Sequence, residues 1–317
     1  MSLRYRSDGT FTIVQFTDLH LGEAIGEEAI KDLQTCRLME HIIDMERPDL
    51  VVITGDLIWS LSVSDPLEAI QRAVAPVQAS GVPWVFVFGN HDAEGEVSRQ
   101  TLMEYLIHHN DHCLAIAGPT NITGTGNYVL TIKESEHDRD AAILYFMDSG
   151  SYANDQVGGY EWIHWDQINW YMDHAYRMKK QNGRSMPALA FFHIPLPEYN
   201  EVWREGSAQG NKYEQVECAR VNSGLFTVML EAGDVIGTFA GHDHDNDYCG
   251  ELHGISLCYG RVTGYNTYGR MKRGARIIRL RQGDRKFDTW IRQEDGTTIQ
   301  QNEALSTSLS AERSIPL

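Results

Sequence analysis

The chain has 317 residues, enough for one α/β domain with insertions or for two smaller units, and we expect a single domain. Its 44 acidic and 27 basic residues give a formal net charge of −17. Such a chain has no basic surface to bind the phosphates of a long nucleic acid, so polynucleotide substrates are disfavoured. No apolar run is long enough to span a bilayer.

The amino-terminal segment carries no apolar leader, which predicts a cytoplasmic location for the chain as given; export after removal of a leader is the alternative. Five cysteines are scattered without a CxxC pair, which argues against a structural zinc knot. An odd count suits a reducing compartment. Cys249 and Cys258, however, flank one short segment and could pair in an exported protein.

A β-branched and aromatic run over residues 11–18 predicts a buried strand that delivers a carboxylate at its end. Residues 49–56 and 82–92 repeat this pattern, each with a glycine followed by polar side chains. Apolar residues at helical spacing predict two helices between these strands, from Ile30 up to Pro48 and over residues 67–79. The order βαβαβ implies right-handed crossovers and parallel strands.

Alternating helix and strand patterns continue through the rest of the chain. We expect helices over residues 97–109, 162–180 and 216–232, and strands over 127–133, 141–148, 188–193 and 235–240. Short strands and hairpins should follow Gly250. One domain is expected to cover residues 1–294, followed by a polar, Gln- and Ser-rich tail over residues 295–317 that we expect to be loosely held.

Five polar clusters fall at the carboxyl ends of predicted strands, which is where ligands bind in α/β sheets. Two divalent ions roughly 3.5–4 Å apart need a shared anionic bridge flanked by imidazole and oxygen donors. Asp18 and His20, two residues apart at an extended strand end, project to the same side and can chelate one ion, while Asp56 can bridge. The other candidate donors are Asn90, His193, His242 and His244.

A lone Asp-x-His or Gly-Asp motif is more often a capping carboxylate or a satisfied histidine than a metal ligand. Five motifs in this order, each at a predicted strand end, reverse those odds. They are Asp18-Leu-His20, Gly55-Asp56, Gly89-Asn90-His91-Asp92, His193 and Gly241-His242-Asp243-His244. Together they resemble the signature of the calcineurin-like metallophosphoesterase superfamily, and the resemblance spans most of residues 12–244.

The resemblance implies an α/β fold, a four-layer αββα sandwich in which two mixed sheets are flanked by helices. It also implies two divalent metal ions as cofactors, of manganese, iron or zinc. One ion is implied at Asp18, His20, Asp56 and His244, and the other at Asp56, Asn90, His193 and His242. His91 matches the family's catalytic histidine, which binds no metal itself and is placed to give a proton to the leaving oxygen.

Within the superfamily the chain looks most like the short purple-acid-phosphatase-like branch, judged from His193-Ile-Pro-Leu-Pro and from the run that begins at Gly241. Trp59 stands three residues after Asp56, where true purple phosphatases carry a tyrosinate ligand, which argues against a ferric ion. His20 takes a ligand role where that subfamily has glycine. The chain also lacks the Asp-Arg-Gly continuation typical of serine/threonine protein phosphatases.

The resemblance predicts an enzyme that hydrolyses phosphate esters by attack of a metal-activated water. We expect a phosphomonoesterase acting on a small molecule or a phosphoprotein. A cyclic-nucleotide or other phosphodiesterase is the alternative, since the same two-metal core serves both reactions. A metal-binding scaffold is the non-enzymatic alternative, although a scaffold has no need of His91.

Three further residues are weaker site candidates. Asp92 could orient His91, but adjacent side chains of an extended segment point apart, so we expect Asp92 to cap a helix. Asp148 ends another apolar strand and could shape the site from behind. Arg99 is a candidate substrate contact, in a region where specificity residues tend to lie. The other candidates of this kind are Tyr160, Arg204 and Tyr265.

Overall fold

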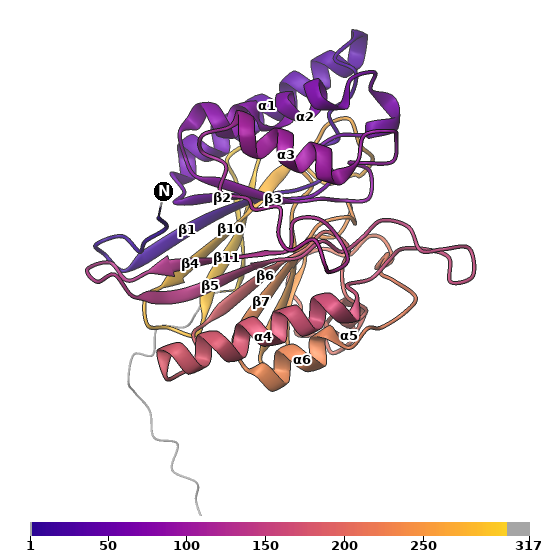
Figure 1. The fold of residues 1–317 in the computed structure, drawn as a ribbon. Helices are drawn as coiled ribbons and strands as arrows, with labels where there is room; N and C mark the ends of the chain where they lie inside the picture. Colours follow the sequence, from indigo (N-terminus) through magenta and orange to yellow (C-terminus); the bar gives the residue numbers. More distant parts are fainter. Residues whose placement is uncertain (1, 303–317) are drawn as a thin grey trace, which may run out of the picture.

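The computed structural model describes residues 2–302, which form two stacked sheets between two groups of helices (Figure 1). The helices of one outer layer are α1 (Gly26–Glu46), α2 (Pro66–Ser80) and α3 (Arg99–His109). Those of the other are α4 (Trp165–Asn182), α5 (Glu198–Arg204) and α6 (Leu225–Ala232). The expected αββα sandwich of two mixed sheets is confirmed. No helix in the described part of the chain is long and apolar enough to cross a membrane.

The first sheet has six strands in the order β12-β11-β10-β1-β2-β3. Their bounds are β1 (Thr10–Phe16), β2 (Leu50–Thr54), β3 (Trp84–Val87), β10 (Gly274–Arg281), β11 (Phe287–Gln293) and β12 (Thr298–Asn302). Strand β2 runs parallel to both β1 and β3, which confirms the expected βαβαβ unit. Strand β10 pairs antiparallel with the other side of β1. The carboxyl ends of β1, β2 and β3 therefore open at one edge of this sheet.

The second sheet also has six strands, in the order β4-β5-β6-β7-β9-β8. Their bounds are β4 (Tyr128–Lys133), β5 (Asp140–Phe146), β6 (Ala188–Phe191), β7 (Val235–Ala240), β8 (Cys249–Leu252) and β9 (Ile255–Tyr259). Strands β5, β6, β7 and β9 are parallel, and β4 and β8 pair antiparallel at the two edges. The loops that follow these parallel strands therefore lie together at one end of the sandwich.

Buried phenylalanines fill the space between the sheets. The rings of Phe146, Phe191 and Phe239, on neighbouring strands of the second sheet, stack in a row with centroids 5.1–5.2 Å apart. Phe287 of the first sheet continues this row 5.4 Å from Phe239. Complete burial of each ring contributes about 1.5–3 kcal/mol. The row fixes the two sheets against each other, so the loops at their ends are held on a rigid support.

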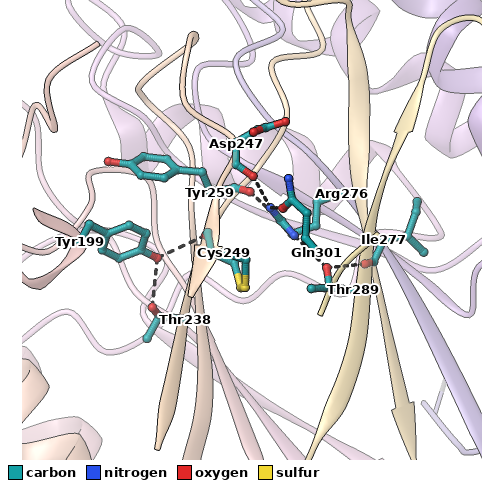
Figure 2. Close-up of a disulfide and its surroundings, with 10 residues drawn as sticks. Tyr199, Thr238, Asp247, Cys249, Tyr259, Arg276, Ile277, Thr289 and Gln301 are labelled. Carbon is teal, nitrogen blue, oxygen red and sulfur yellow. Dashed lines mark hydrogen bonds between the residues drawn. A yellow bond between two sulfur atoms is a disulfide. The ribbon is translucent and has the colours of Figure 1, made fainter. Parts of the chain in front are cut away.

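A buried arginine also joins the two sheets (Figure 2). Arg276 of β10 donates to the backbone oxygens of Tyr259, at the end of β9, and of Asp247, in the loop before β8 (2.6 Å). It also donates to the side-chain oxygen of Gln301 in β12 at 2.6 Å. Burial lowers the pKa of Arg276 to about 10, so it stays charged at neutral pH. Its donors are bonded to oxygens on both sides of the sandwich, which compensates the burial of this charge.

Beside this arginine, Cys249 and Cys258 lie opposite each other on β8 and β9 and form a disulfide (Figure 2). The sequence left the state of this pair open, and the structure contains the bonded form. The remaining three cysteines, Cys36, Cys113 and Cys218, are free and partly buried.

Two expectations from the sequence are wrong. Residues 298–302 belong to the sheet rather than to a tail, because β12 pairs with β11 and the Gln301 side chain reaches Arg276. The remainder of the expected tail, residues 303–317, lies outside the described residues. The helix expected over residues 216–232 begins only at Leu225, since Gly224 adopts a left-handed conformation (φ 84°) at its start.

Candidate metal centre

Seven buried side chains with metal-ligating atoms converge where the two sheets open. Each lies in a loop directly after a strand, which is why side chains distant in the sequence meet here. The contributing strands and residues are β1 with Asp18 and His20, β2 with Asp56, β3 with Asn90, β6 with His193, and β7 with His242 and His244. These are all seven ligands that the sequence predicts.

The first group of donor atoms comes from Asp18, His20, Asp56 and His244, and these atoms lie within 4.8 Å of one another. Nε2 of His20 is 3.3 Å from Nε2 of His244 and 3.4 Å from Oδ2 of Asp56. Nε2 of His244 is 3.4 Å from Oδ1 of Asp18. Two imidazole nitrogens and two carboxylates therefore face one small volume.

The second group comprises Asp56, His193 and His242, again within 4.8 Å of one another. Nε2 of His193 is 3.2 Å from Oδ2 of Asp56 and 3.2 Å from Nδ1 of His242. The amide oxygen of Asn90 lies 3.2 Å from the same His193 nitrogen. Asp56 belongs to both groups, so its carboxylate is placed to bridge them.

The protonation states of the histidines fit a pair of cations. Nδ1 of His193 lies 2.7 Å from the backbone oxygen of Thr54, so that nitrogen carries a proton and Nε2 is the nitrogen that faces the centre. Burial lowers the pKa of His20 to about 4 and that of His242 to about 3. Both imidazoles are therefore neutral near pH 7, which is the form that binds metals.

The carboxylates make the second group attractive to positive charge. Burial acts to lower the pKa of His193, yet the adjacent Asp56 carboxylate raises it to about 9. The attraction of Asp56 for a positive charge in this pocket therefore outweighs the destabilisation of that charge by burial. A divalent ion among the same oxygens and nitrogens would replace that proton, and the mixed imidazole, carboxylate and amide donors suit such an ion.

The backbone around these residues is strained. Asp18, His20, Asp56 and His242 have φ values of 55°, 46°, 52° and 77°, in the left-handed region that residues with a side chain rarely adopt. Each costs on the order of 1–3 kcal/mol, and such strain concentrates at functional sites. Hydrogen bonds from the Asp18 and His20 amides to the backbone oxygens of Gly55 (3.1 Å) and Asp56 (3.0 Å) hold part of this geometry.

A glycine allows two of the loops to approach each other. A Cβ atom added to Gly89 would lie 2.1 Å from Oδ1 of Asp56 and 2.5 Å from its backbone nitrogen. Neither atom can move without displacing the shared carboxylate. Only glycine therefore permits the contact that places Asn90 beside Asp56.

His91 lies next to the first group of donors without belonging to it. Its ring centroid is 5.3 Å from that of His20, and its backbone amide donates to Oδ1 of Asp56 at 2.9 Å. Nδ1 of His91 lies 2.8 Å from Oε2 of Glu94. The other carboxylate oxygen of Glu94 accepts a hydrogen bond from the Tyr152 hydroxyl at 3.0 Å. The imidazole of His91 is thus oriented by a carboxylate that is itself held in place.

Glu94 is a site residue that our sequence analysis missed. Its backbone amide donates to Oγ of Ser60 at 2.9 Å, and that hydroxyl donates to the backbone oxygen of His91 at 2.6 Å. These contacts close a tight turn that brings position 94 back to position 91. A carboxylate three residues after a candidate catalytic histidine was the available signal, but the turn that makes them meet was not evident.

Asp92 does not cap a helix, and the expectation that it would is wrong. Its Oδ1 accepts hydrogen bonds from the amides of Leu57 (2.7 Å) and Ile58 (3.1 Å), and its Oδ2 from those of Asp56 (3.0 Å) and Gly89 (2.8 Å). Burial raises the pKa of Asp92 to about 7, and the nearby Asp56 adds to the effect. The residue clamps the loop that carries Asp56 to the loop that carries Asn90.

Arg99 and Asp148 support the loops from behind. The guanidinium of Arg99 pairs with Asp148 and donates to the backbone oxygens of Gly89 (2.6 Å) and Gly150 (2.9 Å). Its side chain is only 15% exposed, so its donors serve the protein rather than a substrate. Both side chains line a cavity of about 320 Å³. A role for Asp148 in shaping the site stays a prediction, while the contacts of Arg99 with Asp148 and two backbone oxygens favour a structural role for the arginine.

The remaining candidates for substrate contact fall in different places. The ring of Tyr160 lies 4.3 Å from that of His242, at the centre. The hydroxyl of Tyr265 is bonded to Glu294 and its amide to Thr35, so both polar groups are taken up by the protein. Arg204 is exposed at the last position of α5.

Residues 11–246 match the family model described as calcineurin-like phosphoesterase. The chain belongs to the calcineurin-like phosphoesterase family. This confirms the resemblance inferred from the motifs and the enzyme class expected from it, the metallophosphoesterases.

Curated relatives cover most of the chain. It is 35% identical to a protein named "Probable inactive purple acid phosphatase 29" of Arabidopsis thaliana, over 92% of this chain and 85% of that one. It is 37% identical to "Phosphatase DCR2" of Saccharomyces cerevisiae, over 92% of this chain but only 55% of that protein. The names of these relatives agree with the expected purple-acid-phosphatase-like branch.

Two solved structures share the fold. A dimetal phosphatase from Danio rerio superposes with a TM-score of 0.58 at 14% identity, covering 92% of this chain and 99% of that one. Purple acid phosphatase PPD1 from yellow lupin gives a TM-score of 0.54 at 14% identity, covering 93% of this chain and 53% of that one. At this identity the likeness establishes the arrangement of the sheets and helices.

Proposed function

We propose that the protein is a binuclear-metal phosphomonoesterase. The observation that carries this proposal is the Asp56 carboxylate, shared by two buried donor groups and bonded to the backbone of His91. A shared carboxylate is what two adjacent cations require, and a histidine beside them that binds neither supplies acid–base chemistry.

The proposed ligands of the first ion are Asp18, His20, Asp56 and His244, and those of the second are Asp56, Asn90, His193 and His242. When bound, the two ions would acidify a water molecule and offset the charge of the phosphoryl oxygens. Hydrogen bonds from Thr17 (2.8 Å) and from the His242 amide (3.1 Å) orient the Asp18 carboxylate before any ion arrives. The Asp18 carboxylate is thus already oriented in the folded chain, before metal binds.

His91 is the proposed proton donor to the leaving oxygen. Glu94 accepts the hydrogen bond from Nδ1, which leaves Nε2 as the nitrogen that faces a substrate. The side chain is 27% exposed, so a substrate entering from solvent can reach it.

Manganese, iron(II) and zinc all suit the proposed donor set of imidazole, carboxylate and amide groups. A ferric ion held by tyrosinate does not, because position 59 holds a tryptophan whose ring centroid is 6.4 Å from that of His20. Which of these metals the protein binds would therefore depend more on their availability in the cell than on the types of ligand.

The phosphatase names of the relatives support a monoester substrate, either a small molecule or a phosphoprotein. The phosphodiesterase alternative has narrower support, since the "Probable cyclic nucleotide phosphodiesterase" of Psychrobacter arcticus matches only 28% of this chain. The word "inactive" in several names favours the scaffold alternative. The complete set of candidate ligands together with His91 favours an enzyme.

One experiment tests these alternatives. The purified chain is loaded with manganese, its metal content is measured, and it is assayed on p-nitrophenyl phosphate and bis-p-nitrophenyl phosphate. We expect two ions per chain, a preference for the monoester, and a loss of about 10²–10⁴-fold in kcat for His91→Ala with both ions retained. His108→Ala, an exposed histidine of α3, is the matched control.

A preference for the diester would favour the phosphodiesterase instead. Two bound ions without turnover on either ester would favour the scaffold. A chain that binds no metal would overturn the proposal altogether.

The Cys249–Cys258 disulfide supports the exported alternative for the location of the protein. Disulfides persist in oxidising compartments and are rare in the cytosol. We therefore propose that the protein functions outside the reducing cytoplasm, and recovery of the oxidised pair from its native source would test this.

A further inference from the structure

Aromatic rings gather around the metal centre on its solvent side. Trp59 is 46% exposed and its ring lies 5.7 Å from that of His91, while Tyr152 is 48% exposed and its ring lies 6.4 Å from the same histidine. Tyr268 is 57% exposed and stacks on His244 at 4.1 Å. Single exposed aromatic residues are ordinary, but these gather at one site.

These rings come from loops far apart in the sequence, so local pattern does not explain why they meet. Trp59 follows β2, Tyr152 lies between β5 and α4, and Tyr268 lies between β9 and β10. Each contacts a histidine of the centre from a different segment. We call Trp59, Tyr152 and Tyr268 the aromatic rim.

Two members of the rim lie beside the group proposed to protonate the leaving oxygen. The Tyr152 ring is fixed there, because its hydroxyl accepts from Nδ2 of Asn90 at 3.0 Å and donates to Glu94 at 3.0 Å. Trp59 contacts the rings of both His91 and His20. A leaving group that departs toward His91 therefore emerges against the faces or edges of these two rings.

The groups that accept hydrogen bonds from the two tyrosine hydroxyls of the rim are carboxylates. Glu94 accepts from the Tyr152 hydroxyl, and Glu214 accepts from the Tyr268 hydroxyl at 2.9 Å. Carboxylates here repel a substrate that carries further phosphate groups beyond the one at the metals. An uncharged, flat leaving group meets no such penalty and can stack on the rings.

We propose that the aromatic rim selects aryl phosphate monoesters, in which an aromatic ring is bonded directly to the ester oxygen. This inference rests on the proposed phosphomonoesterase activity and names its substrate class. Water adds to phosphorus, the bond from phosphorus to the aryl oxygen breaks, and that oxygen takes a proton from His91. The products are a phenol and inorganic phosphate, and the proton released by the attacking water balances the one that His91 gives to the phenol.

The first test compares phenyl phosphate with glycerol 2-phosphate on the metal-loaded chain. Trp59→Ala should lower kcat/KM for phenyl phosphate about fivefold more than for glycerol 2-phosphate, mainly through KM, as expected for one lost aromatic contact. Trp59→Phe should restore most of the difference. Tyr176→Ala, which removes a 50% exposed ring of α4, is the matched control and should affect both esters equally.

The second test measures binding without turnover, by calorimetry with phenylphosphonate and methylphosphonate. The wild type should bind the phenyl compound more tightly, and Trp59→Ala should remove most of this advantage. Equal losses on both esters, or equal affinity for both phosphonates, overturns the aryl preference. If neither ester is hydrolysed by the wild type, the proposed activity fails, and the phosphonates still decide whether the rim selects aryl groups.

Discussion

The carboxylate of Glu94 lies 2.8 Å from Nδ1 of His91 and is held there by the Tyr152 hydroxyl. This pair fixes which imidazole nitrogen faces the metal centre. Glu94 therefore acts on the reaction through the orientation of His91.

Replacing Glu94 should therefore impair turnover without emptying the metal sites. We expect Glu94→Ala to lower kcat about 10–100-fold while KM and metal content change little, because the imidazole loses its orientation but the ligands remain. Glu94→Gln, which keeps a hydrogen-bond acceptor, should recover part of the loss. Steady-state kinetics on p-nitrophenyl phosphate and metal analysis measure both effects.

Glu104→Ala, on the exposed face of α3, provides the control for a lost carboxylate. A variant at position 94 that loses metal, or whose kcat equals that of the wild type, would contradict the assigned role.

Metal removal should destabilise the protein, because binding to the folded chain alone adds free energy of unfolding. At a metal concentration of one hundred times Kd the gain is about 2.7 kcal/mol per site. We expect chelation to lower the thermal midpoint of the wild type, and manganese to restore it. Asp56→Asn should show neither response, because this carboxylate belongs to both donor groups.

Asp44→Asn, at an exposed position of α1, should respond to chelation as the wild type does. Differential scanning calorimetry with and without chelator measures these thermal midpoints. A full response to manganese in Asp56→Asn would show that the two groups do not share this residue.

Asp92 should matter for stability more than for chemistry. Its carboxylate accepts four backbone hydrogen bonds in a fully buried position, and Asp92→Ala leaves those amides without a partner. Each unsatisfied group costs about 1–3 kcal/mol, and the losses are not fully additive. We expect the free energy of unfolding in urea to fall by about 3–5 kcal/mol.

Asp111→Ala, which removes an exposed carboxylate after α3, should change that free energy by less than about 0.5 kcal/mol. A loss below about 1 kcal/mol for Asp92→Ala would mean that water satisfies the freed amides.

The disulfide predicts a specific thiol count. Under denaturing, non-reducing conditions, alkylation followed by mass spectrometry should label three of the five cysteines, leaving Cys249 and Cys258 unlabelled. Cys258→Ser should lower the free energy of unfolding of the oxidised protein by about 2–3 kcal/mol, since the bond closes a short loop in the unfolded chain.

Adding reductant should remove the difference between Cys258→Ser and the wild type. Cys218→Ser serves as the control for loss of a partly buried thiol. Labelling of all five cysteines in the oxidised protein would contradict the pairing.

The sequence was sufficient to predict the fold class and to name the residues that meet at the centre. Apolar strands that end in glycine and polar residues are local patterns, and parallel strands bring their carboxyl ends to one edge. Asp18, Asp56 and His193 could thus be placed together without a structure. Their order along the chain sufficed because each lies at most two residues beyond its strand.

Tertiary structure decided how the neighbours of these residues are used. Asp92 and Glu94 are both carboxylates close to His91, but which one contacts the imidazole depends on a turn closed by Ser60 from another loop. Arg99 supports the loops of Gly89 and Gly150 because its guanidinium pairs with Asp148 and donates to the backbone oxygens of both glycines. Ser60 and Asp148 lie 31 and 49 residues from their partners His91 and Arg99, so spacing along the chain carries no signal of these contacts.

The same distinction explains strand β12 and the aromatic rim. Residues 298–302 are polar and lack the pattern of a buried strand, yet β11 and Arg276 supply hydrogen bonds that hold them in the sheet. Nothing in the sequence distinguishes Trp59 and Tyr268 from other exposed aromatic residues, but in the structure two loops place them at the same centre. Strand-end motifs are determined locally by hydrophobic patterning, whereas these features arise from long-range contacts that form only when both sheets have packed.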